Sequence, residues 1–329
     1  MFKKKFLPLD GRQLKIQTEN NHDFIKEIMN GSFLEKFTFV NKIHTLVTPP
    51  ITSYVKNKKE KHFQKTNSRV LETNFFLFDG LKRIKIVREN GGKAGALAII
   101  YNFWETVTFF ELFLPTSWIE VFWASSLNCK SVRNRYKLIR SILSMAIYRR
   151  YEINGDKDIN ILEVAAGSSQ VLIRTIAYMK RKGIIIKAKL IDIDEKSLES
   201  ARHLAERLGV LDQIETKTQN LFKYFSTEDD RRTFDIIEMV GIADYLTDEQ
   251  KDFVYGSSYK KLHKNGFLIT ANISDNPERE FIHTVADWPD MIYRKEEEMV
   301  DFVVKAGFTK NLVFKEPLGV YVIAVGEKD

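Results

Sequence analysis

Short apolar runs alternate with amphipathic stretches through the C-terminal half of the chain. The runs have the length of buried strands, and the stretches between them have the apolar spacing of helices. Strands that alternate with helices in this way are typical of a parallel sheet. We expect strands at residues 159–166, 189–192, 213–218, 234–241, 262–270, 308–314 and 319–326. The pattern therefore predicts an α/β domain over residues 151–329.

The N-terminal half follows a different pattern. Residues 131–151 form an amphipathic helical pattern, with apolar side chains at Val132, Tyr136, Ile139, Leu143 and Ala146 and basic ones on other faces at Arg133, Arg135, Lys137 and Arg140. We expect this helix to pack against the α/β core and to lead into its first strand. A chain of 329 residues is longer than one core usually holds. Residues 1–150 are therefore predicted to form a mostly helical accessory domain that supplies a lid or a substrate pocket.

The first predicted strand runs into a turn of small residues. Glu163 is followed by Ala165, Gly167 and Ser168, and small residues let the backbone approach a ligand closely. The second predicted strand ends at Asp192, whose carboxylate can receive the hydroxyl groups of a ribose. Together, the turn and the carboxylate predict a site for a nucleotide-type cofactor.

These segments resemble the class I S-adenosylmethionine-dependent methyltransferases, a Rossmann-like superfamily. The first motif of that family reads acidic-x-Gly-x-Gly-x-Gly, and Glu163 and Gly167 match it, while Ala165 and Ser169 replace two glycines. The family also has an acid at the end of its second strand and an alanine nine residues later, here Asp192 and Ala201. The resemblance implies a seven-stranded methyltransferase sheet with a C-terminal antiparallel hairpin.

The resemblance also implies S-adenosylmethionine as the cofactor. Asp192 is then expected to bind the ribose hydroxyls, with Asp194 as the alternative, and Asn220 to contact the adenine amino group. The full set of residues expected to bind the cofactor is Glu163, Ala165, Gly167, Ser168, Asp192, Ile193, Asn220, Leu221 and Gly241.

Two features separate methyl transfer from hydride transfer. The fingerprint Gly-x-Gly-x-x-Gly of nicotinamide dehydrogenases is absent. The short connection at residues 316–319 predicts a hairpin between the last two strands, which the methyltransferases have and those dehydrogenases lack. Both features favour a methyltransferase.

Catalysis by such an enzyme depends chiefly on alignment, because the sulfonium methyl group is already activated. A base is needed only where the acceptor atom must lose a proton. Asp244 and Tyr245 follow the fourth predicted strand and are candidates to orient or deprotonate an acceptor hydroxyl, although Asp244 can equally begin the next helix and Tyr245 can pack. The motifs of amino-methylating and cytosine-C5 nucleic-acid enzymes are absent here, which disfavours DNA base methylation.

Charge divides the two halves of the chain. Residues 1–150 contain 26 Lys and Arg against 12 Asp and Glu, whereas residues 151–329 contain 25 against 32. A basic domain can attract an anionic partner such as RNA or an anionic membrane, although a basic run such as residues 56–65 is often only a solvated surface. A single cysteine, Cys129, excludes a disulfide framework, and six scattered histidines suggest no metal site.

Residues 94–123 are rich in aromatic side chains, but their longest charge-free piece is too short to span a membrane. We expect core helices or strands here, with an apolar substrate pocket as the alternative. Residues 273–289 follow the fifth strand and are the best lid candidate in the catalytic half. Because no signal peptide develops near Met1, we expect a cytoplasmic protein.

Three functions remain open from the sequence. The first is a methyltransferase acting on an O or N atom of a small-molecule or lipid-type substrate, which the resemblance of residues 241–246 to bacterial fatty-acyl methyl ester-forming enzymes favours. The second is an RNA methyltransferase guided by the basic half. The third is a non-catalytic scaffold, suggested by Ala165 and Ser169 in place of glycine.

Overall fold

The fold is built around one seven-stranded sheet. A computed structural model describes residues 34–66, 82–92, 94–108, 111, 115–155, 158–227 and 232–329. The strands are β1 (Ile159–Val164), β2 (Ile186–Asp192), β3 (Ile214–Thr218), β4 (Phe234–Val240), β5 (Leu262–Ile273), β6 (Lys310–Lys315) and β7 (Tyr321–Glu327). Their order in the sheet is β3-β2-β1-β4-β5-β7-β6. All seven predicted strands are therefore confirmed, with bounds that differ by a few residues.

Strands β1 to β5 are parallel, and β7 runs antiparallel between β5 and β6. The last two strands pair with each other, so the predicted C-terminal hairpin is confirmed. The carboxyl ends of parallel strands meet at one edge of a sheet, where loops and ligands of such folds are usually found. The candidate residues after β1, β2 and β4 therefore share that edge.

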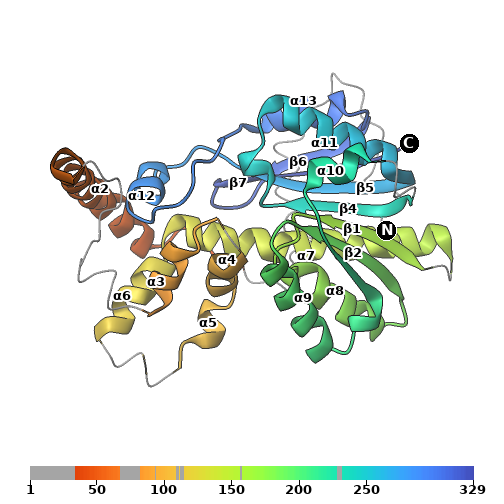
Figure 1. The fold of residues 1–329 in the computed structure, drawn as a ribbon, viewed down its shortest axis with the longest axis horizontal. Helices are drawn as coiled ribbons and strands as arrows, with labels where there is room; N and C mark the ends of the chain where they lie inside the picture. The colour runs from red at the N-terminus through yellow and green to blue at the C-terminus, as the bar shows by residue number, and fades with distance from the viewer. Residues whose placement is uncertain are drawn as a thin grey trace.

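Helices cover both faces of the sheet (Figure 1). One face carries α7 (Leu127–Asn154), α8 (Gln170–Lys180) and α9 (Glu195–Arg207), whose buried apolar residues pack with Ile159 and Ile161 of β1. The other face carries α10 (Leu221–Ser226), α11 (Asp248–Lys261) and α13 (Glu296–Lys305), which pack with Leu162 and Val164. Strand residues that alternate between two buried faces explain why the strands read as continuous apolar runs.

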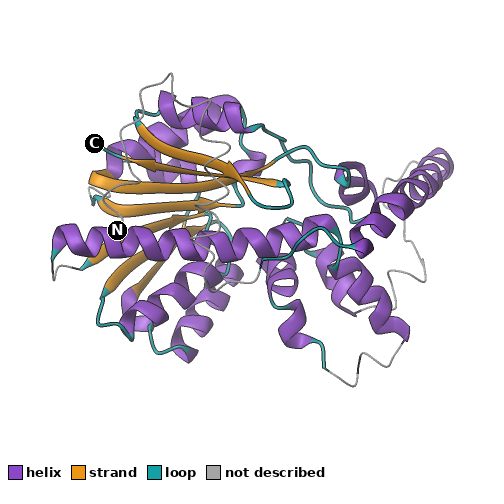
Figure 2. Ribbon diagram, turned by 180° about the vertical axis from the view of Figure 1, so that it is seen from behind, coloured by secondary structure: helices purple, strands orange, loops and turns teal. Residues whose placement is uncertain are grey.

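The long helix α7 joins the accessory helices to the sheet, as the amphipathic pattern predicted. Figure 2 shows it starting beside the accessory helices and passing across the strands. The accessory helices are α2 (Phe39–Thr66), α3 (Lys82–Glu89), α4 (Ala94–Tyr101), α5 (Phe103–Thr106) and α6 (Pro115–Ala124), with α12 (Arg279–Thr284) against α2. The predicted domain boundary at residue 150 lies within α7, four residues before the helix ends.

The aromatic stretch at residues 94–123 forms helices where it is described. The basic run at residues 56–65 lies in the second half of α2, on mostly exposed positions. No described helix combines the length and apolar character that a membrane span requires. The prediction about a signal peptide near Met1 and one of the six histidines, His22, concern residues outside the described part of the chain.

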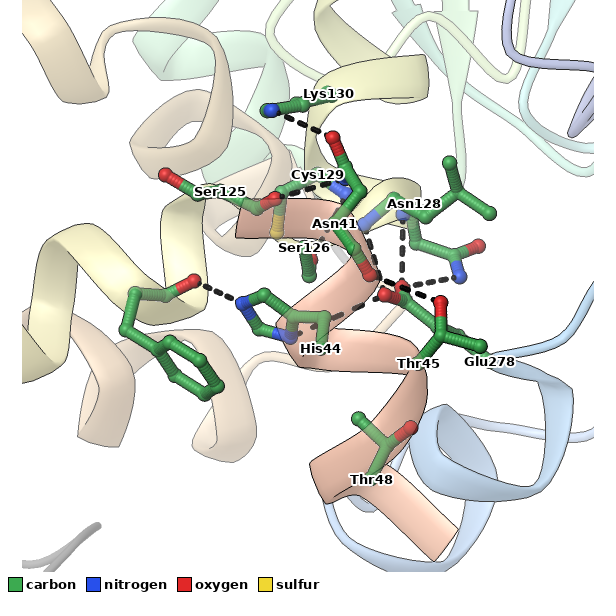
Figure 3. A network of polar contacts seen from close by, with 12 residues as sticks. Asn41, His44, Thr45, Thr48, Ser125, Ser126, Asn128, Cys129, Lys130 and Glu278 are labelled. Atoms are coloured by element: carbon green, nitrogen blue, oxygen red, sulfur yellow. Dashed lines mark hydrogen bonds and ion pairs between the residues drawn. The ribbon is translucent and has the colours of Figure 1, made fainter. Parts of the chain in front are cut away.

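A buried polar network fixes α2 and the loop before α12 to the start of α7 (Figure 3). The Glu278 carboxylate accepts hydrogen bonds from the backbone N–H groups of Leu127 at 2.9 Å and Asn128 at 3.0 Å, so it caps α7. His44 of α2 donates from Nε2 to the Phe122 carbonyl at 2.5 Å, and its Nδ1 lies 4.0 Å from Glu278. The network sets the position of α7 relative to the catalytic half.

Candidate functional site

The turn after β1, residues 165–169, is the first part of the site and is called the glycine loop below. Its residues Ala165, Gly167 and Ser169 all have positive φ angles, of 52°, 54° and 49°. Two non-glycine residues thus adopt a left-handed conformation that glycine adopts more easily. The backbone turn that the family motif produces with three glycines is present here with only one.

Asp192 binds the glycine loop directly. Its Oδ2 accepts a hydrogen bond from the Gly167 N–H at 2.7 Å, and its Oδ1 accepts one from the Asp194 N–H at 2.8 Å. The structure therefore brings together the two features that the sequence predicted to form one site. Asp194 instead caps α9 by accepting from the Lys196 N–H, which leaves Asp192 as the carboxylate beside the loop.

A second pair of carboxyl groups lies beneath the loop. Glu163 of β1 accepts a hydrogen bond from the Ser169 hydroxyl and lies opposite Glu238 of β4 in the sheet register. Burial raises the pKa of Glu238 to about 8. Burial, and then the nearby Glu238 carboxyl, raise the pKa of Glu163 well above its usual value. Glu163 thus supports the loop through Ser169. Its partner Glu238 lies within an apolar strand and was not predicted.

An apolar surface and an amide follow on the neighbouring strands. Ile193, directly after Asp192, is 71% exposed, although large aliphatic side chains are usually buried. The Asn220 Oδ1 caps α10 by accepting from the N–H groups of Phe222 at 2.8 Å and Lys223 at 3.4 Å. Because that oxygen is already used twice, the Asn220 side chain offers its NH2 group as a donor, which suits a ring nitrogen of adenine and not the amino group expected from the resemblance. Leu221 is buried beneath it.

The residues after β4 form the other side of the site. Gly241 has a φ of 101°, and a side chain at this position would point into open space. Asp244 is buried and accepts from the Ile273 N–H at 2.5 Å, and burial raises its pKa while Arg135 opposes the shift. The Tyr245 hydroxyl accepts from Trp288 Nε1 at 3.0 Å, and burial raises the pKa of Tyr245 to about 12. Both candidates therefore lie beside the site. Asp244 joins the segment after β4 to the end of β5 through the Ile273 N–H, and Tyr245 carries a neutral hydroxyl.

The turn between α3 and α4 lies close to both the glycine loop and the residues after β4. A side chain on Gly92 would meet Pro289 at 3.0 Å and the Tyr245 hydroxyl at 3.3 Å. A side chain on Gly167 would meet the Ala94 methyl group at 3.1 Å. The start of α4 therefore contacts the glycine loop, while the turn before it contacts the residues after β4. The accessory helices therefore approach the site at both places, and their role as a lid stays a prediction.

The predicted lid in the catalytic half, residues 273–289, also reaches the site. Trp288 contacts Tyr245, and Asp287 binds Lys59 of α2 and Arg88 of α3, the latter at 2.6 Å. This segment therefore connects the accessory helices to the edge of the sheet. Among the described residues, no group of histidines, cysteines and carboxylates has the arrangement of a metal site.

One expectation was wrong and concerns the basic side chains of α7. We expected Arg133 and Arg135 on faces away from the packed side of the helix, but their exposures are 3% and 2%. Because α7 is covered by the sheet on one side and by accessory helices on the other, it has almost no solvent-facing surface here. Arg135 lies at the site, 3.7 Å from Asp244, and sequence periodicity missed it.

Comparison with known proteins places this geometry in a family. Residues 155–312 match the family model described as a methyltransferase domain. This part of the chain is a methyltransferase domain. No curated protein matches the sequence.

Two solved structures extend the likeness to the accessory helices. A possible exported protein from Bordetella parapertussis has a TM-score of 0.59 and 14% identity, over 86% of this chain and 97% of its own. The CMeT domain of the citrinin polyketide synthase has a TM-score of 0.52 and 12% identity, over 96% of each chain. At such identities the likeness concerns the fold of the methyltransferase and its N-terminal extension.

The residues of this methyltransferase domain fit S-adenosylmethionine, the cofactor that the resemblance implied. Asp192 is fixed by two backbone donors at the end of β2, where a ribose would be bound. Ile193 presents an exposed apolar side chain that a purine ring can cover. The open space beside Gly241 leaves room for a ligand between the glycine loop and the residues after β4.

Proposed function

We propose that the protein binds S-adenosylmethionine at the glycine loop and Asp192 and transfers its methyl group to an O or N atom of a small-molecule or lipid-type acceptor. The hydrogen bond between the Gly167 N–H and Asp192, at 2.7 Å, carries this proposal. It joins the turn that approaches the cofactor to the carboxylate that receives its ribose. The remaining predicted contacts, Ile193, Asn220, Leu221 and Gly241, lie on the adjoining strand ends.

The bound cofactor supplies an activated methyl group on a sulfonium. The protein has to align the acceptor with that group and to keep water away. Tyr245 holds its proton at neutral pH because its pKa is about 12, so it orients an acceptor as a hydrogen-bond donor. The α3–α4 turn lies over the hydroxyl of Tyr245 and excludes water. Asp244 positions this segment through its bond to the Ile273 N–H.

Several observations favour a small or lipid-type acceptor over RNA. An apolar cluster with aromatic side chains includes Trp288, which donates to Tyr245, and aromatic surroundings commonly receive apolar ligands. Basic residues of the described N-terminal half already have acidic partners, including Lys59 with Asp287, Arg83 with Glu120 and Arg133 with Glu35. Less of the positive charge is therefore available for a phosphate backbone. The left-handed Ala165 and Ser169 support cofactor binding over the scaffold alternative, because the loop keeps its shape.

A labelled-methyl assay tests the function and the acceptor class together. The full-length protein is incubated with labelled S-adenosylmethionine and cell extract, and the products are divided into nuclease-sensitive, protease-sensitive and solvent-extractable fractions. We expect label in the solvent-extractable fraction, and clearly less with Asp192→Asn when the labelled cofactor is kept below saturation. Label confined to the nuclease-sensitive fraction would establish the RNA alternative instead, and no transfer to any fraction would favour the scaffold.

A further inference from the structure

Helix α2 has its polar and apolar faces in the reverse of the usual arrangement. A helix at a protein surface normally turns its apolar side chains to the core and its polar ones to solvent. In the first half of α2 the large apolar side chains are exposed instead, with Phe39 at 75% and Leu46 at 76%. The polar side chains buried on the same stretch are Asn41, His44, Thr48 and Thr52. The protein therefore presents an apolar helix face to solvent.

The exposed apolar side chains form one continuous stripe along the helix. Its members, called the apolar stripe below, are Phe39, Ile43, Leu46, Pro50 and Tyr54. They are separated by three or four residues, the spacing that places side chains on one face of a helix, and the buried polar residues follow the same spacing on the opposite face. Single exposed apolar residues are common on protein surfaces, whereas contiguous ones mark a surface for a partner or a membrane.

Polar contacts fix which face of α2 points inward (Figure 3). Lys130 of α7 donates to the Asn41 Oδ1 at 2.8 Å. The His44 ring donates to the Phe122 carbonyl and stacks on the Phe122 ring with 3.7 Å between centroids. A rotation of α2 that buried the apolar stripe would separate these buried polar groups from their partners, at a high cost in free energy. The apolar stripe is thus held in solvent by the packing of the opposite face.

The second half of α2 is basic and continues the same face. Residues 55–66 contain five lysines and a single acidic residue. Three exposed lysines, called the basic stripe below, follow Tyr54 at helical spacing: Lys58, Lys61 and Lys65. The Lys58 ammonium lies 5.1 Å from the centroid of the Tyr54 ring, so the two stripes adjoin. Figure 1 shows α2 at the end of the molecule away from the sheet, where a large surface can reach it.

The combination of both stripes selects the kind of partner. An anionic lipid surface uses both, because apolar side chains enter the acyl boundary while lysines reach the phosphates and a tyrosine lies at the level of the headgroups. RNA would use the basic stripe, but aliphatic side chains such as Ile43 and Leu46 offer no stacking surface for its bases. A second copy of this chain would bring the lysines of two α2 helices to one interface, where like charges repel.

We propose that α2 docks the protein on an anionic lipid surface. The helix lies in the plane of that surface, with the apolar stripe in the acyl boundary and the basic stripe at the lipid phosphates. The buried polar face stays bound to α6 and α7, so docking requires no rearrangement of the accessory helices. The inference goes beyond the proposed function, because this surface lies outside the cofactor site.

Vesicle co-sedimentation of the full-length protein tests the proposal without any cofactor. One set of vesicles contains phosphatidylcholine alone, and the other contains equal parts of phosphatidylcholine and phosphatidylglycerol. We expect at least about tenfold tighter binding to the anionic vesicles, and a loss of that preference at high salt, because the lysines are exposed. Absence of binding to the anionic vesicles, or equal binding to both sets, would overturn the proposal.

Variants then test the two stripes separately. Leu46→Ser should weaken binding to the anionic vesicles about tenfold, since it removes an aliphatic side chain from the acyl boundary. Its matched control is Leu211→Ser, at a leucine beside β3 that is 41% exposed. Lys61→Gln should weaken binding about fivefold, with the exposed Lys260→Gln of α11 as its control. Both controls should bind like the wild type, and thermal melts followed by circular dichroism check that every variant folds.

The pattern across the variants separates a lipid surface from the other partners. If Lys61→Gln weakens binding and Leu46→Ser does not, the surface recognises charge alone, as RNA binding would require, and the proposal is overturned. If the wild type ignores vesicles and Leu46→Ser turns a dimer into a monomer in sedimentation velocity, the apolar stripe joins two copies, and the proposal is overturned as well. Because the assay contains no S-adenosylmethionine, a failure of the proposed function leaves each of these results unchanged.

Discussion

Glu163 on β1 and Glu238 on β4 occupy paired positions of neighbouring parallel strands, so two carboxyl groups are buried side by side under the glycine loop. Two such groups cannot both be ionised without a large cost. The Ser169 hydroxyl donates to Glu163, which only partly opposes the rise that burial and the Glu238 carboxyl cause in the pKa of Glu163. Glu238 Oε2 has no hydrogen-bond partner and carries the proton at neutral pH.

Glu238→Gln should stabilise the protein at alkaline pH. The pKa of Glu238 is about 8 in the folded state against 4.5 for the free side chain, so folding favours the protonated form. The contribution of the protonated Glu238 side chain to the free energy of unfolding is fully present below pH 4.5 and is lost as the pH rises through 8. The glutamine cannot ionise and removes a penalty on the order of 3 kcal/mol at pH 7.

Chemical denaturation at pH 5 and pH 8 checks this, with the exposed Glu199→Gln as the control. The stability gain of Glu238→Gln over the wild type should be larger at pH 8 than at pH 5, and Glu199→Gln should show no such difference. A gain independent of pH would contradict the account.

Ala165→Gly should stabilise the glycine loop. Ala165 has a φ of 52°, a conformation that costs an L-residue about 1 to 2 kcal/mol, while a glycine loses about 0.5 to 1 kcal/mol through its greater freedom in the unfolded chain. The free energy of unfolding should therefore rise by about 0.5 to 1 kcal/mol. Ala166→Gly, whose φ is not positive, is the matched control and should lower it. If both changes destabilise equally, Ala165 is not strained.

Gly92→Val should loosen the lid. Gly92 has a φ of 74°, and a side chain there meets Pro289 and Tyr245, so the α3–α4 turn cannot keep its place. Release of S-adenosylhomocysteine, measured by stopped-flow fluorescence, should become several-fold faster. Gly95→Ala adds a methyl group at ordinary contact distance on the same segment and should leave the rate unchanged. Unchanged release from both variants would show that the turn does not cover the bound cofactor.

Glu278→Ala should uncouple the accessory helices from the sheet. Its carboxylate caps α7 through two backbone N–H groups and is 1% exposed, so its loss leaves buried donors unpaired. We expect the free energy of unfolding to fall by about 2 kcal/mol. The exposed neighbour Glu280→Ala should change it by less than about 0.5 kcal/mol. Equal small effects in denaturant melts would refute the capping role.

Sequence reasoning was most successful for the sheet. Apolar runs bounded by polar turns identify the buried strands β1, β2, β4, β5 and β7 because these strands are covered on both faces. The hairpin of β6 and β7 followed from the short turn between them. The meeting of Gly167 and Asp192 could be predicted because both lie at the carboxyl ends of neighbouring strands. This part of the site can therefore be predicted from the order of the motifs along the chain.

What sequence reasoning missed depends on contacts between distant segments. Arg135 looks like a surface residue in the periodic pattern of α7, and only the packing of α4 and β7 against that helix buries it. Glu238 lies within an apolar strand, and its role depends on Glu163 across the sheet. The contact of the accessory helices with the glycine loop, through Ala94, likewise has no local signal.

The cofactor site is tested most directly by titration calorimetry with S-adenosylmethionine, with NAD as the comparison ligand. The wild type should bind S-adenosylmethionine and not NAD. Asp192→Asn should weaken the binding of S-adenosylmethionine at least about tenfold, because the ribose loses a charged acceptor. Asp194→Asn retains the cap of α9 and should bind like the wild type. Binding of NAD alone, or wild-type affinity in Asp192→Asn, would contradict the account.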